Sequence, residues 1–135
     1  MPQYVLLHHD TPPDYERPSH WDLMFEVGGM LRTWAVPVRP DRDPRQEVEQ
    51  LADHRREYLT YEGPVSENRG SVTREDAGSY EVVEGDIEGK RDGRLVLKLR
   101  GEVLSGRVEL TPVARDYVDQ EAAAPQRWAL SWSAD

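Results

Sequence analysis

Two alternating segments around a pair of glycines constrain the fold of this chain more than any other feature. HWDLMFEV (20–27) precedes Gly28-Gly29, and MLRTWAV (30–36) follows it. Side chains alternate between the faces of a strand, and a glycine pair between two such segments favours a tight hairpin turn. One face of this hairpin then carries a run of apolar side chains: Trp21, Leu23, Phe25, Val27, Met30, Trp34 and Val36. We therefore predict a β-hairpin that turns this face toward the core.

The remaining segments also favour strands. Strand-like composition recurs at 3–7, 70–74, 79–84, 94–100, 106–112 and 127–132, with turn residues at 76–78, 89–93 and 105–106. Short strands at this spacing predict a mostly β fold, either a small antiparallel β barrel, closed or nearly so, or a sandwich. We expect residues 1–135 to form one domain, because the length suits a single core.

One segment, DPRQEVEQLADHRREYL (43–59), is expected to be helical. Asp43 can act as an N-cap, Pro44 suits the first helical position, and Gln46 completes a pattern like a capping box. We therefore predict one or two short helices beside the strands. The segment DYVDQEAAAPQ (116–126) has few apolar residues and is expected to be a loop.

Composition excludes several classes of function. The chain contains no cysteine, which rules out disulfides and thiolate-bound metals. It has no long apolar run and no basic, apolar leader at its start, so we expect a cytoplasmic protein. The net charge of −9 argues against passive binding along nucleic acid, which usually requires a basic surface. Any contact with nucleic acid must therefore be local, through a metal ion and a few arginines.

Three of the four histidines lie within residues 8–20. On the strand 20–27, His20 and Asp22 project side by side from the face opposite the apolar one. Imidazole and carboxylate ligands together suit Mn²⁺, Zn²⁺ or Fe²⁺. A third ligand is needed, and His9 and His8 compete for that role because neighbouring strand residues point in opposite directions.

Several blocks of the sequence resemble the 3′-phosphoesterase domain of bacterial DNA ligase D and its stand-alone homologues. The blocks occur in the family's order: HHD, HWDLMFEVGGMLRTWAVP, ADHRREYLTYEGPV, GRLVLKLRGEVLSGRVEL and WALSW. The resemblance implies a small β barrel over residues 1–135 with a crescent-shaped cleft. It also implies Mn²⁺-dependent removal of a 3′-ribonucleoside and then a 3′-phosphate from DNA ends.

The same resemblance implies roles for individual residues. His9, which aligns at the family's His-Asp step, matches a metal ligand, as do His20 and Asp22. His54 matches a histidine that engages the phosphate, and Tyr58 a tyrosine lining the same pocket. Mn²⁺ is the metal that the family suggests, with Zn²⁺ as the alternative. We further expect a monomer that acts on nucleic-acid 3′ ends, with a DNA-repair ligase or polymerase as partner.

The sequence departs from the family pattern at defined places. Met24 stands where the family has an arginine, so a bidentate phosphate contact is lost there. Ten residues (10–19) separate His9 from His20, more than in the family, and the glycine-rich stretch after Glu62-Gly63 is shortened to PVSENRG. We therefore expect weak or absent 3′-phosphatase activity, unless another arginine such as Arg32 or Arg45 replaces the missing one. Two other hypotheses are a metal-binding barrel without turnover and an interaction module whose histidines bind no metal.

Overall fold

The computed structural model describes residues 2–15, 17–88, 93–113 and 126–135. Within these ranges, ten strands form one sheet. Their bounds are β1 Gln3–Asp10, β2 His20–Val27, β3 Met30–Val36, β4 Arg45–Gln50, β5 His54–Arg55, β6 Gly63–Pro64, β7 Ser71–Glu84, β8 Leu95–Gly101, β9 Ser105–Pro112 and β10 Gln126–Ala134. A single 3₁₀ turn, η1 (Arg56–Leu59), is the helical element among these residues.

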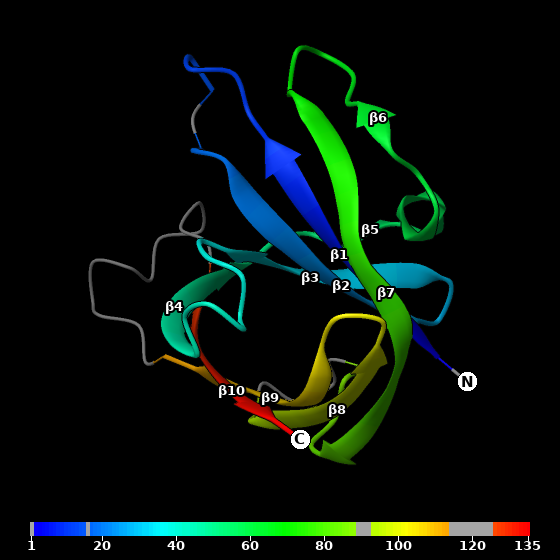
Figure 1. Cartoon of the computed structure of the whole chain (residues 1–135), viewed down its shortest axis with the longest axis vertical. Helices are drawn as coiled ribbons and strands as arrows, with labels where there is room; N and C mark the ends of the chain where they lie inside the picture. The colour runs from blue at the N-terminus through cyan, green and yellow to red at the C-terminus, as the bar shows by residue number, and fades with distance from the viewer. Residues whose placement is uncertain (1, 16, 89–92, 114–125) are drawn as a thin grey trace.

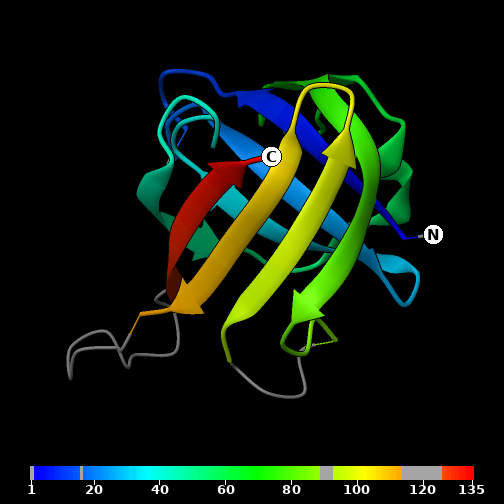
Figure 2. The same cartoon turned by 60° about the horizontal axis from the view of Figure 1, so that its bottom comes forward.

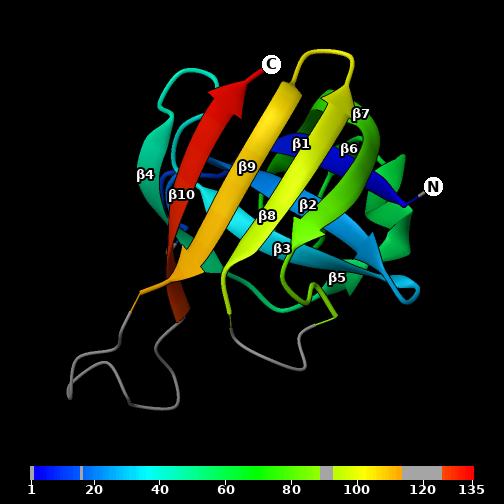
Figure 3. The same cartoon turned by 90° about the horizontal axis from the view of Figure 1, so that it is seen from below.

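Eight of the strands close into an antiparallel barrel in the order β1-β2-β3-β4-β10-β9-β8-β7, and β7 pairs back onto β1. Seen from below, β8, β9 and β10 cross in front of β1, β2 and β3 at a steep angle (Figure 3). Strands β7 to β10 lie side by side along the near wall (Figure 2). The predicted antiparallel β barrel is therefore confirmed.

Two short strands lie off the closed path. Strand β5 pairs with β3, and β6 pairs with β7. Together with η1 they form an excursion that leaves the barrel wall after β4 and returns to it at β7 (Figure 1). This excursion gives β1–β3 an outer cover and creates the second apolar cluster described below.

The predicted hairpin register is confirmed. Leu23 lies opposite Trp34, and Trp21 lies opposite Val36, so the apolar residues share a face. That face fills the barrel interior with the residues Tyr4, Leu6, Leu23, Phe25, Trp34, Val36, Val48, Tyr80, Leu97, Leu99, Val108, Leu110, Trp128 and Leu130, among others. Met30, at the hairpin end, departs from this pattern and is 41% exposed.

The opposite face of β1–β3 is buried as well. A second cluster there contains Val5, Leu7, Met24, Leu31, Leu59 and Val72. Leu59 comes from η1 and Val72 from β7, so the excursion supplies part of the cover. Burial on both faces explains why the first strand reads as a continuous apolar run rather than an alternating one.

The helix expected over 43–59 is wrong. Residues Arg45–Gln50 form β4, which lies between β3 and β10 and completes the barrel. Val48 pairs with Trp128 in the interior, and Gln46 binds the main chain of Val38 instead of capping a helix. A local capping signal is weak against a strand position that closes the barrel, because long-range pairing overrides propensity.

Two predicted turns also differ. Residues 76–78 lie within the continuous strand β7, and Ser105-Gly106 begins β9, so the turn falls at 102–104. Gly78 is needed for close packing rather than for a turn, since an added Cβ would lie 2.1 Å from the carbonyl oxygen of Arg100. Most of the turn predicted at 89–93 and of the loop predicted at 116–126 lies outside the described residues, and Gln126 begins β10.

Within the described ranges, no helix has the length and apolar character required to cross a lipid bilayer.

Candidate metal centre

Three side chains converge at one end of the β1–β2 pair. His9 lies near the end of β1 directly opposite His20, the first residue of β2, and Asp22 follows on the same face. One ligand atom from each of the three lies within 4.8 Å of the others. His8 points to the other face of β1, where its ring lies 4.6 Å from that of Trp21. The strand geometry therefore turns His9, and not His8, toward Asp22.

Main-chain carbonyls fix the orientation of both imidazoles. Nδ1 of His20 lies 2.9 Å from the carbonyl oxygen of Pro18, and Nε2 of His9 lies 2.7 Å from that of Arg69. A carbonyl can only accept, so each of these nitrogens carries the hydrogen. In the neutral rings the remaining nitrogens present lone pairs to the carboxylate, with His20 Nε2 at 2.9 Å from one Asp22 oxygen and His9 Nδ1 at 3.4 Å from the other.

This arrangement requires a cation. Two lone pairs and an ionised carboxylate cannot stabilise one another unless a proton or a metal ion lies among them. Imidazoles that ligate metals typically donate their other N–H to a backbone carbonyl, as His9 and His20 both do. The donor set of two imidazoles and one carboxylate therefore fits Mn²⁺, Zn²⁺ or Fe²⁺.

Electrostatics at the site favour the ionised carboxylate. Asp22 is only 2% exposed, and this burial opposes its ionisation. When the imidazoles of His20 and His9 are protonated, their hydrogen bonds to the carboxylate nevertheless hold the pKa of Asp22 well below its usual range. The bond to Asp22 raises the pKa of His9, while burial and the Arg69 guanidinium act in the opposite direction. Asp22 thus keeps its negative charge, and a proton on His9 competes with a metal for the same place.

The three residues form one wall of a cavity of about 400 Å³. The excursion contributes His54 and Tyr58 to the lining of the same cavity, and their ring centroids lie 5.8 Å apart. Nδ1 of His54 lies 2.9 Å from the carbonyl of Ala52, so its other nitrogen is the one available for a ligand. The structure therefore brings together in one cavity all five residues proposed from the sequence.

Met24 also lines this cavity and belongs to the second apolar cluster. It lies on the same face of β2 as His20 and Asp22, as expected from alternation. Its thioether contributes no charge and no strong hydrogen bond. The place of the family arginine is thus filled by an apolar side chain that is 1% exposed.

The cations of the cavity come from other positions. Arg17, Arg55 and Arg69 line it. Arg32 instead lies inside the barrel, 4.9 Å above the ring of Trp34, and Arg45 begins β4 beside a separate surface groove. Neither Arg32 nor Arg45 occupies the place that the sequence suggested for them.

Sequence reasoning did not identify Tyr15 or Arg17 as cavity residues. Both belong to the proline-containing loop between His9 and His20, and their approach to the cavity depends on how that loop folds back. The only local signal was the unusual length of this loop. Loops that are longer than required to connect two strands often carry functional residues.

The chain is similar in sequence to known proteins over most of its length. The model of the DNA Ligase D 3′-phosphoesterase domain matches residues 8–112. The multifunctional non-homologous end joining protein LigD of Pseudomonas aeruginosa is 35% identical over 96 residues, covering 67% of this chain and 11% of the relative. The LigD of Mycobacterium tuberculosis, a multifunctional non-homologous end joining DNA repair protein, is 34% identical over 104 residues, covering 71% of this chain and 13% of the relative.

A third relative extends the similarity along the chain. The multifunctional non-homologous end joining protein LigD of Mycolicibacterium smegmatis is 29% identical over 132 residues, covering 85% of this chain and 17% of the relative. The chain therefore spans less than a fifth of the length of these curated relatives.

Proposed function

The chain belongs to the DNA ligase D 3′-phosphoesterase domain family, and we propose on this basis that it hydrolyses phosphate esters at the 3′ ends of DNA with a divalent metal ion. The substrates are a 3′-phosphate or a 3′-ribonucleotide. The observation that carries the proposal is the convergence of two imidazole lone pairs on the Asp22 carboxylate inside a cavity.

In this proposal His9, His20 and Asp22 hold the metal ion, with Mn²⁺ as the first choice and Zn²⁺ as the second. When bound there, such an ion would supply the positive charge needed to polarise a phosphoryl oxygen and to activate a water molecule. Pro18 and Arg69 hold the two imidazoles in the tautomers that direct lone pairs inward. Burial of Asp22 and His20 keeps bulk water away from this side of the site.

His54 and Tyr58 act on the side of the phosphate away from the metal. Nδ1 of His54 is committed to Ala52, so its Nε2 faces the substrate. When protonated there, His54 donates a hydrogen bond to a phosphoryl oxygen or gives its proton to the leaving oxygen. Tyr58 packs its ring edge-to-face against His54 and limits how far that imidazole can rotate.

We further propose that residues 1–135 act as one 3′-phosphoesterase-like domain that is monomeric and cytoplasmic. The relatives' names refer to DNA repair and end joining, which supports a repair ligase or polymerase as the partner of this domain.

The direct test is a rate measurement on a duplex primer that ends in a 3′-phosphate, with and without Mn²⁺. Release of phosphate that requires Mn²⁺ and is lost in His20→Ala would support the proposal. Metal analysis of protein purified without an affinity tag provides an independent measurement. Protein that binds no divalent metal would contradict the proposal and favour an interaction module instead.

A metal-binding barrel without turnover is the second candidate. Met24 favours it, because this buried thioether cannot hydrogen-bond a phosphate from the face that carries His20 and Asp22. Metal binding without phosphate release would identify this alternative.

A further inference from the structure

We propose that Arg69, on the turn between β6 and β7, is the residue that binds the phosphate group in the cavity beside the metal centre. This inference rests on the proposed function, since it names the group that holds that substrate. It places the anion contact on a different element from β2, where Met24 leaves the face beside Asp22 without a cation.

Arg69 is positioned by its own turn. Its Nε donates to the carbonyl of Ser66 at 2.8 Å, and one terminal nitrogen donates to the hydroxyl of Ser66 at 2.9 Å. The turn passes through two consecutive residues with left-handed φ, Glu67 at 63° and Asn68 at 56°. A hydrogen bond of 2.8 Å from Val65 N to Gly70 O closes it. The long side chain is therefore held in place before any ligand arrives.

The charge of Arg69 is not neutralised by this anchoring. Both groups that accept from it belong to Ser66 and are uncharged, and no carboxylate pairs with it among the residues that the structure describes. A guanidinium has five N–H donors, and the two bonds to Ser66 leave three. These three are enough for a charge-assisted contact with two oxygens of one phosphate.

The turn is also attached to the metal centre. The carbonyl oxygen of Arg69 accepts the hydrogen bond from Nε2 of His9 at 2.7 Å. Gly70, next to it, packs so tightly on the end of β1 that an added Cβ would lie 2.0 Å from the carbonyl oxygen of Asp10. The position of Arg69 relative to His9 is thus set by main-chain contacts. A phosphate that binds to Arg69 would therefore lie beside His9.

The two other arginines of the cavity suit this role less well. Arg17 is paired with Glu49 at 2.6 Å, so its charge is already compensated. Arg55 is exposed, and no hydrogen bond or ion pair positions its guanidinium within the described part of the chain. Arg69 alone among the three combines a fixed position with an uncompensated charge.

The overall charge of the chain makes a dedicated cation more important. A net charge of −9 repels a phosphate group at long range. A local guanidinium is required to reverse that field within the cavity. A screened surface arginine would not do so, because exposed charges interact weakly in water.

The test is a calorimetric titration of inorganic phosphate into Mn²⁺-loaded protein, preceded by a Mn²⁺ titration of the same sample. Arg69→Gln should weaken phosphate binding about ten-fold or more, the loss typical for a hydrogen bond to a charged group. It should leave Mn²⁺ affinity nearly unchanged, because His9 is held by the main chain of Arg69. The phosphate affinity of Arg69→Lys should lie between those of the wild type and Arg69→Gln, since lysine keeps the charge and loses the planar fork.

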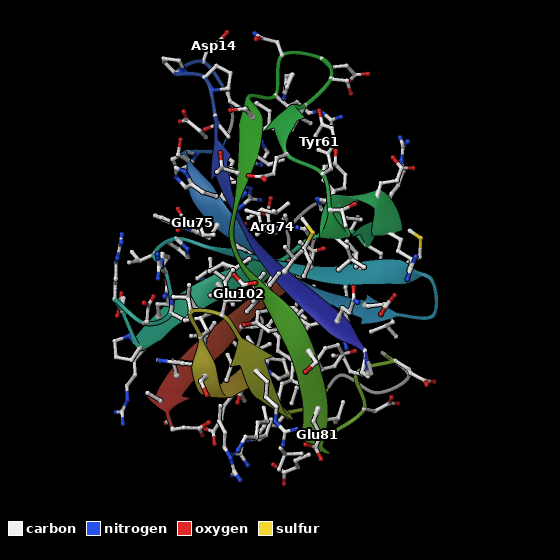
Figure 4. All side chains as sticks on the ribbon, turned by 45° about the vertical axis from the view of Figure 1, so that its right-hand side comes forward. Asp14, Tyr61, Arg74, Glu75, Glu81 and Glu102 are labelled. Atoms are coloured by element: carbon white, nitrogen blue, oxygen red, sulfur yellow. The ribbon has the colours of Figure 1, made fainter. Side chains whose placement is uncertain are left out.

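Arg74→Gln is the matched control. It removes one positive charge from the exposed surface of β7, beside a different cavity. Figure 4 labels Arg74 on the upper part of that strand, below Asp14. Phosphate affinity should stay within about two-fold of the wild type, because an exposed charge outside the cavity contributes little. An equal loss in Arg74→Gln and Arg69→Gln would overturn the proposal, since only a general charge effect would remain.

The results of these titrations distinguish the role of Arg69 from the proposed phosphoesterase function. Wild-type protein that binds neither Mn²⁺ nor phosphate contradicts both. Protein that binds Mn²⁺ but no phosphate, or in which Arg69→Gln binds phosphate as tightly as the wild type, overturns the role of Arg69 alone. If Arg69→Gln does not fold, Arg69→Lys and Ser66→Ala take its place, and unchanged phosphate affinity in both would equally overturn the inference.

Discussion

His20 and Asp22, two residues apart on one strand, direct a ring nitrogen and a carboxylate oxygen at each other across 2.9 Å. Alternation along β2 places both on the same face, and the carbonyl of Pro18 decides which nitrogen points inward. Their geometry therefore depends on a few rigid main-chain contacts. The metal chemistry predicted from it can be tested one side chain at a time.

The first prediction concerns His20→Ala. Loss of a ligand should reduce Mn²⁺ affinity by more than about a hundred-fold, beyond the ten- to hundred-fold loss typical for an outer-shell partner. The fold should remain, because His20 contributes no apolar side chain to either core cluster. Calorimetry and thermal unfolding measure the two effects separately.

His8→Ala is the control for this experiment. His8 is the neighbour of His9 but faces Trp21 on the opposite side of the strand. Its removal should leave Mn²⁺ affinity unchanged. A large loss in His8→Ala with none in His20→Ala would show that the ligand assignment is wrong.

Metal binding should also depend on pH. The hydrogen bond to Asp22 raises the pKa of His9 above its ordinary value near 6.5, against the opposing effects of burial and Arg69. Because Mn²⁺ requires the unprotonated nitrogen, binding must release this proton. Affinity should therefore fall as the pH drops through the raised pKa of His9, and level off above it.

Proton release is measured by calorimetry in two buffers with different ionisation enthalpies. At a pH near the ordinary histidine value, His9 is protonated in more than half of the metal-free molecules, so we expect it to release more than half a proton per bound Mn²⁺. Asp22 contributes little to this count, because its pKa is already held low by His20 and His9 against the effect of burial. Affinity independent of pH between about 5.5 and 8 would contradict the role of His9.

Alkaline stability tests the barrel interior. Burial, with a contribution from Glu26, raises the pKa of Tyr80 to about 12 from 10.0. The folded state thus favours the neutral phenol, which donates to the carbonyl of Glu26 at 2.6 Å. This stabilisation is complete below the unfolded pKa near 10 and is lost as the pH rises through 12. The free energy of unfolding should fall by about 2–3 kcal/mol from this group alone.

Tyr80→Phe isolates that contribution. Tyr4, whose pKa is also raised by burial and by its bond to Asp76, titrates in both proteins, so the difference between them reports on Tyr80. Urea unfolding at pH values from about 9 to 12 should show a shallower decline for Tyr80→Phe. Parallel curves would mean that folding does not change the pKa of Tyr80.

The parts of the fold that could be predicted from sequence are those set by near neighbours. The hairpin of β2 and β3 depends on an alternating pattern and two turn glycines, and both lie within residues 20–36. The segment 43–59 could not be assigned in this way. Its strand β4 is determined by pairing with β10, more than seventy residues further along, as between Val48 and Trp128.

The same distinction applies to the site. The approach of His20 to Asp22 follows from strand alternation, and that of His9 follows from one hairpin pairing. Nothing in the sequence around Arg69 distinguishes it from an ordinary solvated charge. Its position depends on a turn that packs against the end of β1, sixty residues earlier, and no local pattern indicates such a contact.

The last prediction concerns Met24→Arg. We expect weak 3′-phosphatase activity in the wild type, because Met24 supplies no hydrogen bond beside the metal ligands. An arginine there could hold two phosphate oxygens, a contribution of about 1.5–3 kcal/mol, or roughly ten- to a hundred-fold in rate. The gain should be near the lower limit if Arg69 already binds the phosphate, and larger in an Arg69→Gln background.

The same substitution should reduce stability. Met24 is 1% exposed and packs in the second cluster with Val5, Leu7 and Leu31. Placing a guanidinium there should lower the free energy of unfolding by about 1–3 kcal/mol, since a polar group enters an apolar site.

The activity of Met24→Arg is measured by comparing its initial rate on the 3′-phosphate primer with that of the wild type, with Mn²⁺ and at a temperature where both proteins are folded. An equal gain with and without Arg69 would show that the two arginines act independently, whereas metal binding without activity in either protein would favour the barrel that has lost turnover.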